Sequence, residues 1–198
     1  MGDYFEVFRG SNRRGRLPPV EEEINDIANI IQGKVLLNAA FTPEMVAREL
    51  KGENYRVFHM ATHGTFDRDP EKTFLATHDG KISLNKLEEL IKFSQFREEP
   101  LELLTLSACE TAVGDEVAAL GLAGVAVKSG ARSVLASLWQ VSDKATKELM
   151  TEFYRQYFQN PNLTKAQALQ NTQKKLIATT EFNHPSQWAP FLIIGNWL

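Results

Sequence analysis

Two side chains of this 198-residue chain could carry out nucleophilic chemistry together, the imidazole of His63 and the thiol of Cys109. Each follows an apolar run, YRVFHMAT before His63 and LELLTLSA before Cys109. An apolar run that ends in polar or glycine residues is typical of a buried strand that leaves its sheet. A thiol becomes a strong nucleophile when a neighbouring base takes its proton, and imidazole is the usual base.

The spacing of the two runs fits such a pair. His63 and Cys109 are 46 positions apart (109 − 63), and caspases have a histidine roughly 50 residues before their catalytic cysteine. Neighbouring strands lie only about 4.8 Å apart, so the two side chains would meet if their strands pair in parallel. Each residue alone also fits a structural role, Cys109 as a small buried side chain and His63 as a histidine bonded to backbone. The two residues together favour a catalytic dyad, because both lie at strand ends, His63 before a glycine and Cys109 after an alanine.

The other three histidines do not suggest a metal site. His59 lies within an apolar run and is predicted to be a core histidine with satisfied polar atoms, while His78 and His184 fall in loops. No spacing typical of metal ligands links them. We therefore predict neither a metal nor a cofactor.

Composition and charge narrow the classes of function. The net charge of −3 argues against a general nucleic-acid-binding protein, and no apolar run approaches the roughly 20 residues that span a bilayer. We therefore expect neither nucleic-acid nor membrane partners. A single cysteine cannot form an internal disulfide, which favours a reducing, cytoplasmic setting. The length fits one domain over residues 1–198.

Strand and helix patterns alternate along the chain. Strands are predicted at residues 4–8, 34–38, 55–61, 101–106, 132–139 and 188–197, and helices at or just after Val20, Thr42, Ser83, Val117, Ser142 and Thr164. Such alternation predicts an α/β layered fold with a mostly parallel sheet. No glycine-rich phosphate-binding loop follows an early strand, which argues against a nucleotide-binding protein.

Three local features add to this outline. Glu21, Glu22 and Glu23 are expected at the N-terminal end of the first helix, where they suit its dipole. Residues 65–81 are predicted to form a long loop. The helix that begins at Val117 is apolar all round, so we expect it to be buried. Its small residues Gly121 and Gly124 would then pack closely against the sheet.

Several stretches resemble the CHAT domain: ATHG, LSACETA, GLAGVAVKSGARSVLASLWQVSDKAT and the terminal WAPFLIIGNW. The resemblance runs over about residues 17–198. The CHAT family is related to caspases, separases and gingipains and is often attached to tetratricopeptide repeats in bacteria. The resemblance implies a caspase-like three-layer α/β sandwich, with a mostly parallel central sheet and helices on both faces.

The resemblance also implies roles for individual residues. His63 corresponds to the catalytic histidine and Cys109 to the nucleophile. The backbone N–H groups of Gly64 and Cys109 correspond to the oxyanion hole, which stabilises a tetrahedral intermediate, and Gly64 would let backbone approach substrate closely. Substrate would add as an extended strand beside the strand that ends with Ser137-Leu138-Trp139. Ser137 and Trp139 would line the pocket for a substrate side chain. Trp139 also fits a core tryptophan at a strand end.

The loop after Cys109 is acidic, with Glu110, Asp115 and Glu116. It fits a solvated loop, or a pocket in which Asp115 selects a basic residue before the cleaved bond, as in separases and gingipains. The leading hypothesis is a cysteine endopeptidase that cleaves protein substrates in bacterial signalling or defence. The alternative is a dormant or non-catalytic interaction module that needs a partner, such as a repeat domain or regulator.

Overall fold

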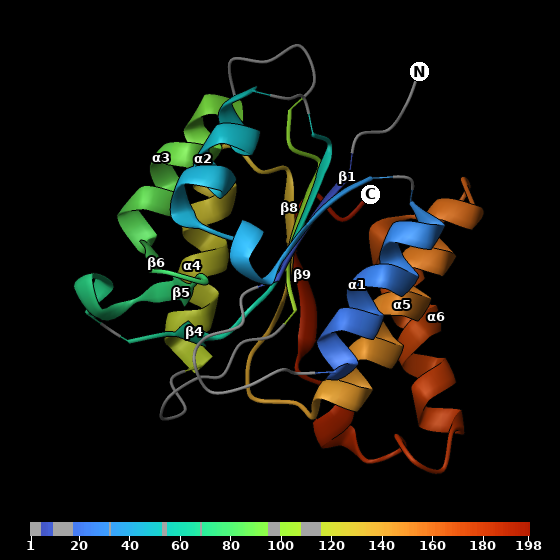
Figure 1. Ribbon diagram of the computed structural model, residues 1–198. Coiled ribbons are helices and arrows are strands. Elements are labelled where there is room, and N and C mark those ends of the chain that lie inside the picture. Colours follow the sequence, from blue (N-terminus) through green and yellow to red (C-terminus); the bar gives the residue numbers. More distant parts are fainter. Residues whose placement is uncertain are drawn as a thin grey trace.

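The apolar runs of the sequence form a six-stranded central sheet (Figure 1). The computed structural model describes residues 5–9, 18–31, 33–52, 55–67, 69–94, 100–107 and 116–198. The strands are β1 (Phe5–Arg9), β2 (Lys34–Leu37), β3 (Val57–Ala61), β7 (Leu103–Leu106), β8 (Ser133–Ser137) and β9 (Phe191–Gly195). Their order is β2-β1-β3-β7-β8-β9, and all pair in parallel except β9, which is antiparallel to β8. The predicted mostly parallel sheet is confirmed.

Helices cover both faces of this sheet (Figure 1). One layer consists of α1 (Pro18–Ile30), α5 (Asp143–Gln159) and α6 (Lys165–Ala178). The other consists of α2 (Pro43–Gly52), α3 (Leu84–Ser94) and α4 (Glu116–Lys128). The predicted three-layer sandwich with helices on both faces is therefore confirmed. Within the described residues, no helix is both long enough and apolar enough to cross a membrane.

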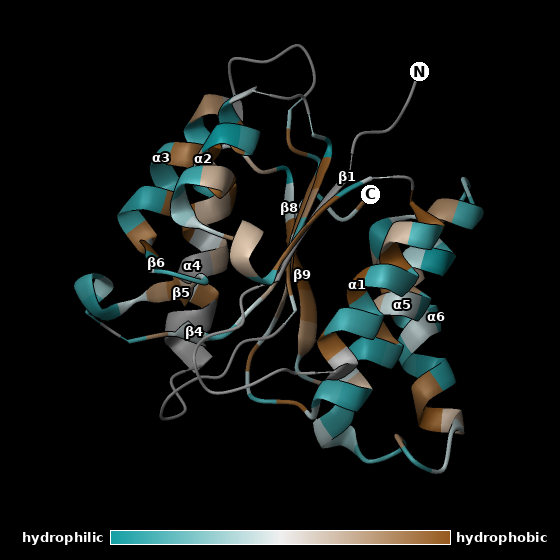
Figure 2. Ribbon diagram, in the orientation of Figure 1, coloured by the Kyte–Doolittle hydropathy of each residue, from teal (hydrophilic) through white to brown (hydrophobic). Residues whose placement is uncertain are grey.

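Each face of the sheet has its own apolar core. Strand β3 supplies both cores, because successive side chains of a strand point to opposite faces. Val57 and Ala61 belong to the core under α1, α5 and α6. Phe58 and Met60 belong to the core under α2, α3 and α4. Apart from the apolar α4, the helices turn their hydrophilic sides away from the sheet, as Figure 2 shows.

Four of the predicted helix starts are capped by a side chain. In each case a side-chain oxygen accepts a hydrogen bond from a backbone N–H of the first turn, which satisfies a donor that the helix leaves free. At α6 the Gln167 side chain also accepts from the N–H of Thr164, which completes a capping box. The capping residues, which accept at 3.1 to 3.3 Å, are Thr42, Ser83, Ser142 and Thr164.

The prediction of a long loop over residues 65–81 is wrong. This segment contains most of a small antiparallel sheet, which lies beside the layer of α3 and α4 (Figure 1). Its elements are β4 (Gly64–Thr65), the 3-10 helix η2 (Pro70–Lys72), β5 (Phe74–Ala76) and β6 (Lys81–Ser83). Strands of two or three residues are too short to show alternation in a sequence.

The prediction that α4 is buried all round is also wrong. Ala123 and Ala126 belong to the apolar core. Leu120, Gly121 and Gly124 are exposed. Outside the helix itself, no atom lies within 4 Å of a Cβ placed on either glycine, so neither glycine packs closely against the sheet. A uniformly apolar helix has no periodicity from which its buried side could be identified.

The small sheet holds the segment that follows β3. The Thr62 hydroxyl donates to the backbone oxygen of Ala76 at 2.6 Å. The backbone N–H of Ala76 donates to the backbone oxygen of His63 at 2.8 Å. Gly64 then pairs with Leu75 of β5. The backbone around His63 is therefore fixed from two sides, by β3 and by the small sheet.

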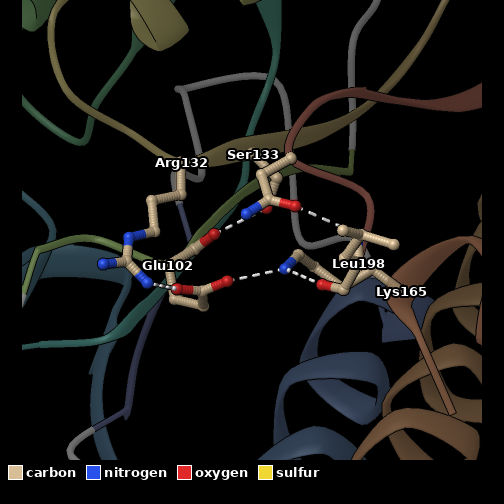
Figure 3. Close-up of polar contacts among 6 residues, drawn as sticks. Glu102, Arg132, Ser133, Lys165 and Leu198 are labelled. Atoms are coloured by element: carbon tan, nitrogen blue, oxygen red, sulfur yellow. Dashed lines mark hydrogen bonds and ion pairs between the residues drawn. The ribbon is translucent and has the colours of Figure 1, made fainter.

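Charged side chains join the amino ends of β7 and β8 to α6, as Figure 3 shows. The Glu102 carboxylate accepts from Lys165 at 2.6 Å and from Arg132 at 3.1 Å. Lys165 is fully buried and also donates to the backbone oxygen of Leu198 at 2.7 Å. The Ser133 hydroxyl donates to the Glu102 backbone oxygen at 2.5 Å. Burial would raise the pKa of Glu102, but the bonds from Lys165 and Arg132 outweigh it and hold this pKa below its usual value of 4.5.

We predict that Glu102→Gln lowers the free energy of unfolding by about 3 kcal/mol at neutral pH, because the buried ammonium of Lys165 loses its counter-charge. The folded pKa of Glu102 lies below its unfolded value, so its ionisation stabilises the fold above pH 4.5, and this contribution is lost as the pH falls. Urea unfolding at neutral pH and at about pH 3 should therefore show a smaller acid-induced loss in the variant. Glu181→Gln, at an exposed pair with Lys144, is the control, and an equal destabilisation there would contradict the prediction.

Gly64→Ala is predicted to lower the free energy of unfolding by roughly 1–3 kcal/mol through overpacking. A Cβ on Gly64 would lie 2.8 Å from the ring of Phe66 and 3.1 Å from Leu75, and Phe66 is itself buried. Urea unfolding of Gly64→Ala, Phe66→Leu and the double variant measures the coupling between the two positions. The smaller leucine should relieve part of the alanine penalty, whereas strictly additive penalties would show that the ring is not the obstacle.

Candidate functional site

The carboxyl ends of β3 and β7 lie side by side. This is the parallel pairing that the proposed meeting of His63 and Cys109 requires. The two strands are parallel neighbours, with Met60 opposite Leu106. The backbone N–H of Ser107 extends this ladder by donating to the oxygen of Met60 at 3.1 Å. His63 follows β3 and is half-buried. Sites of open α/β folds form outside the carboxyl ends of strands, and this edge is one such place.

Two of the predicted site residues, Cys109 and Asp115, lie outside the described residues. The described chain stops at Ser107 and resumes at Glu116, the first residue of α4. The dyad, the oxyanion hole and the acidic pocket therefore stay predictions. Over the part of the chain that the structure describes, no three His, Cys, Asp or Glu side chains are grouped as a metal site requires.

Gly64 is buried directly after His63, where β4 pairs with β5. We expected its missing side chain to admit substrate backbone. The structure gives another reason for glycine here, because the ring of Phe66 occupies the space that a Cβ would need. Packing alone therefore favours glycine at this position, with or without a contact between its N–H group and substrate.

Ser137 and Trp139 lie at the carboxyl end of β8, one strand beyond β7 in the sheet. Ser137 is buried, whereas Trp139 is half-buried. The indole N–H of Trp139 donates to the backbone oxygen of Ser186 at 3.4 Å. Ser186 belongs to the 3-10 helix η3 (Pro185–Gln187). The orientation of Trp139 is therefore set by a segment that precedes β9.

One side of the β8 exit is already occupied by chain. Ser137 pairs with Phe191 of β9. The backbone N–H of Leu138 donates to the oxygen of Pro190 at 3.0 Å. On the other side, the pairing of β8 with β7 runs to Ala136 in the described residues. On the β9 side, therefore, no place remains at this exit for an extended peptide to add as a strand.

A buried polar network lies behind this edge, on the α1 and α5 face of the sheet. The Nε2 atom of His59 lies 3.0 Å from a carboxylate oxygen of Glu23 and 2.9 Å from Ser107 Oγ. Its Nδ1 atom lies 3.1 Å from the Tyr154 hydroxyl, which donates to Thr105 at 2.7 Å. All five residues are at most 2% exposed. The prediction that His59 is a core histidine with satisfied polar atoms is confirmed.

For Glu23, as for Glu21 and Glu22, the sequence suggested only a favourable place near the N-terminal end of the first helix, and its burial was missed. Glu23 is 1% exposed, and its carboxylate meets His59 inside the protein. A carboxylate on a buried face requires a polar partner there. The sequence does contain the missed signal, because the i, i+3, i+4, i+7 spacing of a buried helix face is occupied by Val20, Glu23, Ile24 and Ile27.

Comparison with known sequences identifies relatives of this chain. The CHAT domain model matches residues 7–196. Tetratricopeptide repeat protein 28 from Homo sapiens is 34% identical over 101 residues, and that from Mus musculus is 34% identical over 100 residues. These matches cover 49% and 48% of this chain but 4% of each relative, so the chain spans a small part of their length.

Solved structures of cysteine proteases share the fold. The Arg-specific cysteine proteinase gingipain R gives a TM-score of 0.69 at 11% identity, covering 98% of this chain and 46% of its own. The Drosophila initiator caspase Dronc gives 0.54 at 8% identity, covering 97% and 79%. A secreted cysteine protease from Bacteroides thetaiotaomicron, solved with an irreversible peptide inhibitor, gives 0.55 at 10% identity, covering 90% and 60%. Identities this low show the fold alone, which is caspase-like. Because the CHAT domain model matches nearly the whole length of this chain, the chain belongs to the CHAT domain family.

Proposed function

We propose that this chain is a cysteine endopeptidase that cleaves protein substrates through His63 and Cys109. One observation carries the proposal: β3 and β7 pair in parallel with an offset of 46 residues, as in Met60 opposite Leu106 (106 − 60). His63 and Cys109 are separated by the same 46 residues (109 − 63). The two residues therefore follow equivalent points of two neighbouring strands. The fold shared with three cysteine proteases supports the same assignment.

In the proposed reaction His63 takes the thiol proton of Cys109, and the thiolate sulfur attacks the carbonyl carbon of the scissile peptide bond. The carbonyl oxygen becomes an oxyanion, which the backbone N–H groups of Gly64 and Cys109 stabilise. His63 then gives its proton to the leaving amine as the C–N bond breaks, which leaves a thioester on the sulfur. Water, deprotonated by His63, attacks this thioester and releases the acid and the free thiol.

The proposed substrate is an extended peptide with a basic residue before the cleaved bond. The β9 side of the β8 exit is already paired, so a peptide would add on the β7 side, where it would run past the proposed dyad. Ser137 and Trp139, the latter tied to Ser186, would line the pocket beside it. Asp115 and Glu116 follow the proposed nucleophile in the sequence, and Asp115 would bind the basic side chain. Gingipain R, which shares this fold, is Arg-specific.

We also propose that residues 1–198 form one domain, that the setting is cytoplasmic, and that a repeat domain acts as partner or regulator. The curated relatives are named for tetratricopeptide repeats, which supports the repeat partner. Both relatives are mammalian. The bacterial signalling or defence role expected from the resemblance therefore stays a prediction.

Cys109→Ala is predicted to abolish cleavage of a peptide substrate. His63→Ala should lower kcat/KM by about 100- to 10,000-fold, the usual contribution of a general acid–base. His78→Ala is the matched control, because His78 is exposed in the turn between β5 and β6 and should leave kcat/KM unchanged. A loss of activity in all three variants would point to a damaged fold instead of a dyad.

A peptide acyloxymethyl ketone tests the same dyad without a known substrate. The probe alkylates an activated thiolate, so it should label Cys109 in the wild-type chain and fail to label it in His63→Ala. Labelling is read by mass spectrometry of the single cysteine. If iodoacetamide reaches Cys109 but the probe does not, and no peptide is cleaved, the peptidase proposal fails for this chain alone. A dormant interaction module that needs a partner would then be favoured.

Fluorogenic peptides that differ only in the residue before the cleaved bond test the proposed preference. We expect Arg and Lys to give the highest kcat/KM. Asp115→Asn should lower this preference by about tenfold or more. A tenfold ratio corresponds to about 1.4 kcal/mol, which one charged hydrogen bond can contribute. Glu116→Gln is the control for the general charge of the loop. Equal or better cleavage after Leu or Asp would remove the preference and leave the peptidase proposal standing.

A further inference from the structure

The sheet face under α1 and α5 changes from apolar to polar toward its carboxyl edge. Side chains on one face of a strand recur at every second residue. On this face β3 presents Val57 and then His59. Strand β7 presents Leu103, then Thr105, and the chain continues to Ser107. The buried polar groups are therefore gathered at one end of the face instead of being scattered over it.

The hydrogen bonds of Tyr154 orient the ring of His59. Tyr154 donates to Thr105, so its oxygen accepts from Nδ1 of His59. The Nε2 atom on the other side of the ring faces the Glu23 carboxyl group and the Ser107 hydroxyl. Both ring nitrogens of His59 are therefore bonded inside the protein. Burial raises the pKa of Tyr154 far above its usual value, and the Glu23 charge adds to this, so the hydroxyl keeps its proton.

Ser107 is the member of the network nearest to Cys109 in the sequence. Its backbone N–H donates to the oxygen of Met60 at 3.1 Å, which adds a rung to the β3–β7 ladder. Its hydroxyl oxygen lies 2.9 Å from Nε2 of His59, the same ring atom that lies 3.0 Å from a carboxyl oxygen of Glu23. Ser107, where the chain leaves β7, is thus held by its backbone nitrogen and by its hydroxyl oxygen. It precedes Cys109 by two residues.

Two other roles for these residues are conceivable: a catalytic triad, which the geometry excludes, and pure stabilisation of the fold, which the energetics disfavour. In a Ser–His–carboxylate triad the serine and the acid bind opposite ring nitrogens, whereas Ser107 and Glu23 both lie at Nε2 of His59. The residues are at most 2% exposed, so a substrate cannot reach them. A purely stabilising role is a poor explanation, because apolar groups of the same shape can replace buried hydrogen-bonded partners at little or no cost in stability.

We infer that Glu23, His59 and Ser107 form a positioning network that fixes the point where the chain leaves β7. Glu23 holds the ring of His59, and His59 in turn holds the hydroxyl of Ser107. None of the three touches substrate. With the proposed function, on which this last step rests, the network sets the direction from which Cys109 approaches His63.

Ser107→Ala tests the inference against Ser133→Ala. Both serines are buried and both variants lose one hydroxyl, but Ser133 lies at the opposite, amino end of β8, where it donates to the Glu102 backbone oxygen. The rate constant for alkylation of Cys109 by iodoacetamide is measured at neutral pH, and every modification reports on this residue because the chain has one cysteine. Hydrogen–deuterium exchange of the peptides that cover residues 103–117 is measured in parallel.

We expect Ser107→Ala to change the alkylation rate constant by about tenfold or more and to speed exchange in the peptides after β7. Ser133→Ala should leave both unchanged. In a cleavage assay, Ser107→Ala should lower kcat with KM unchanged, because a displaced nucleophile affects the chemical step and not substrate binding. Alkylation and exchange equal to those of the wild-type chain would overturn the inference.

Glu23→Gln is a second test that leaves the Ser107 hydroxyl in place. Glutamine keeps the shape of the side chain but replaces one carboxyl oxygen with an amide group, which weakens its bond to Nε2 of His59, so exchange after β7 should again speed up. The matched control is Glu49→Gln, which changes another buried carboxylate, in α2, bonded to Tyr55. Faster exchange after β7 in both variants would indicate a general loss of stability and overturn the inference.

The outcomes separate this inference from the proposed function. If no form of the chain cleaves peptides but Ser107→Ala still alters exchange and alkylation, the peptidase proposal fails and the positioning network stands. If the wild-type chain cleaves peptides and Ser107→Ala matches it in all three measurements, the network is overturned and the peptidase proposal stands.

Discussion

The parallel ladder between β3 and β7 is the constraint on which the rest of this structure depends. Every residue of both strands is buried, because helices cover the sheet on both faces. A slip of one residue would turn apolar side chains of one core toward the other and move His59 and Thr105 away from Tyr154. The relative height of the two carboxyl ends is therefore determined in the middle of the sheet, by packing on both faces, and not by the loops at its edge.

The two ends of the sheet use buried polar groups in different ways. At the amino end, the Arg132 side chain that meets Glu102 is 53% exposed, so solvent shares the charge of that cluster. At the carboxyl end, Glu23 and His59 are closed to solvent. Water can hydrate Arg132 at the first end, whereas Lys165, Glu23 and His59 are all closed to it, and low dielectric makes an unpaired group costly at each of these positions. The two ends therefore differ in that solvent reaches part of the amino-end cluster but none of the Glu23–His59 contact.

The outline of the fold was accessible from the sequence because its signals are local. Apolar runs marked the main strands, and residues such as Thr42 and Ser142 marked helix starts. The strand order was not accessible, because no local pattern states that β1 lies between β2 and β3. The strands β4 to β6 are too short to show a period. Glu23 was missed although it lies on an apolar helix face, since its partner His59 is distant in the chain. For Cys109, the sequence identified the residue, but its surroundings lie outside the described chain.

The residues of the buried network are widely separated along the chain, from Glu23 in α1 to Tyr154 in α5. During synthesis β3 and β7 can emerge and pair before α5 exists, and at that stage His59 has no tyrosine hydroxyl and the sheet face is bare. Contacts of such large sequence separation are slow to form, so this edge reaches its final arrangement only when the last helical layer docks. If the chain is the peptidase proposed above, nascent and half-folded copies would lack this finished edge and would not cleave the proteins around them.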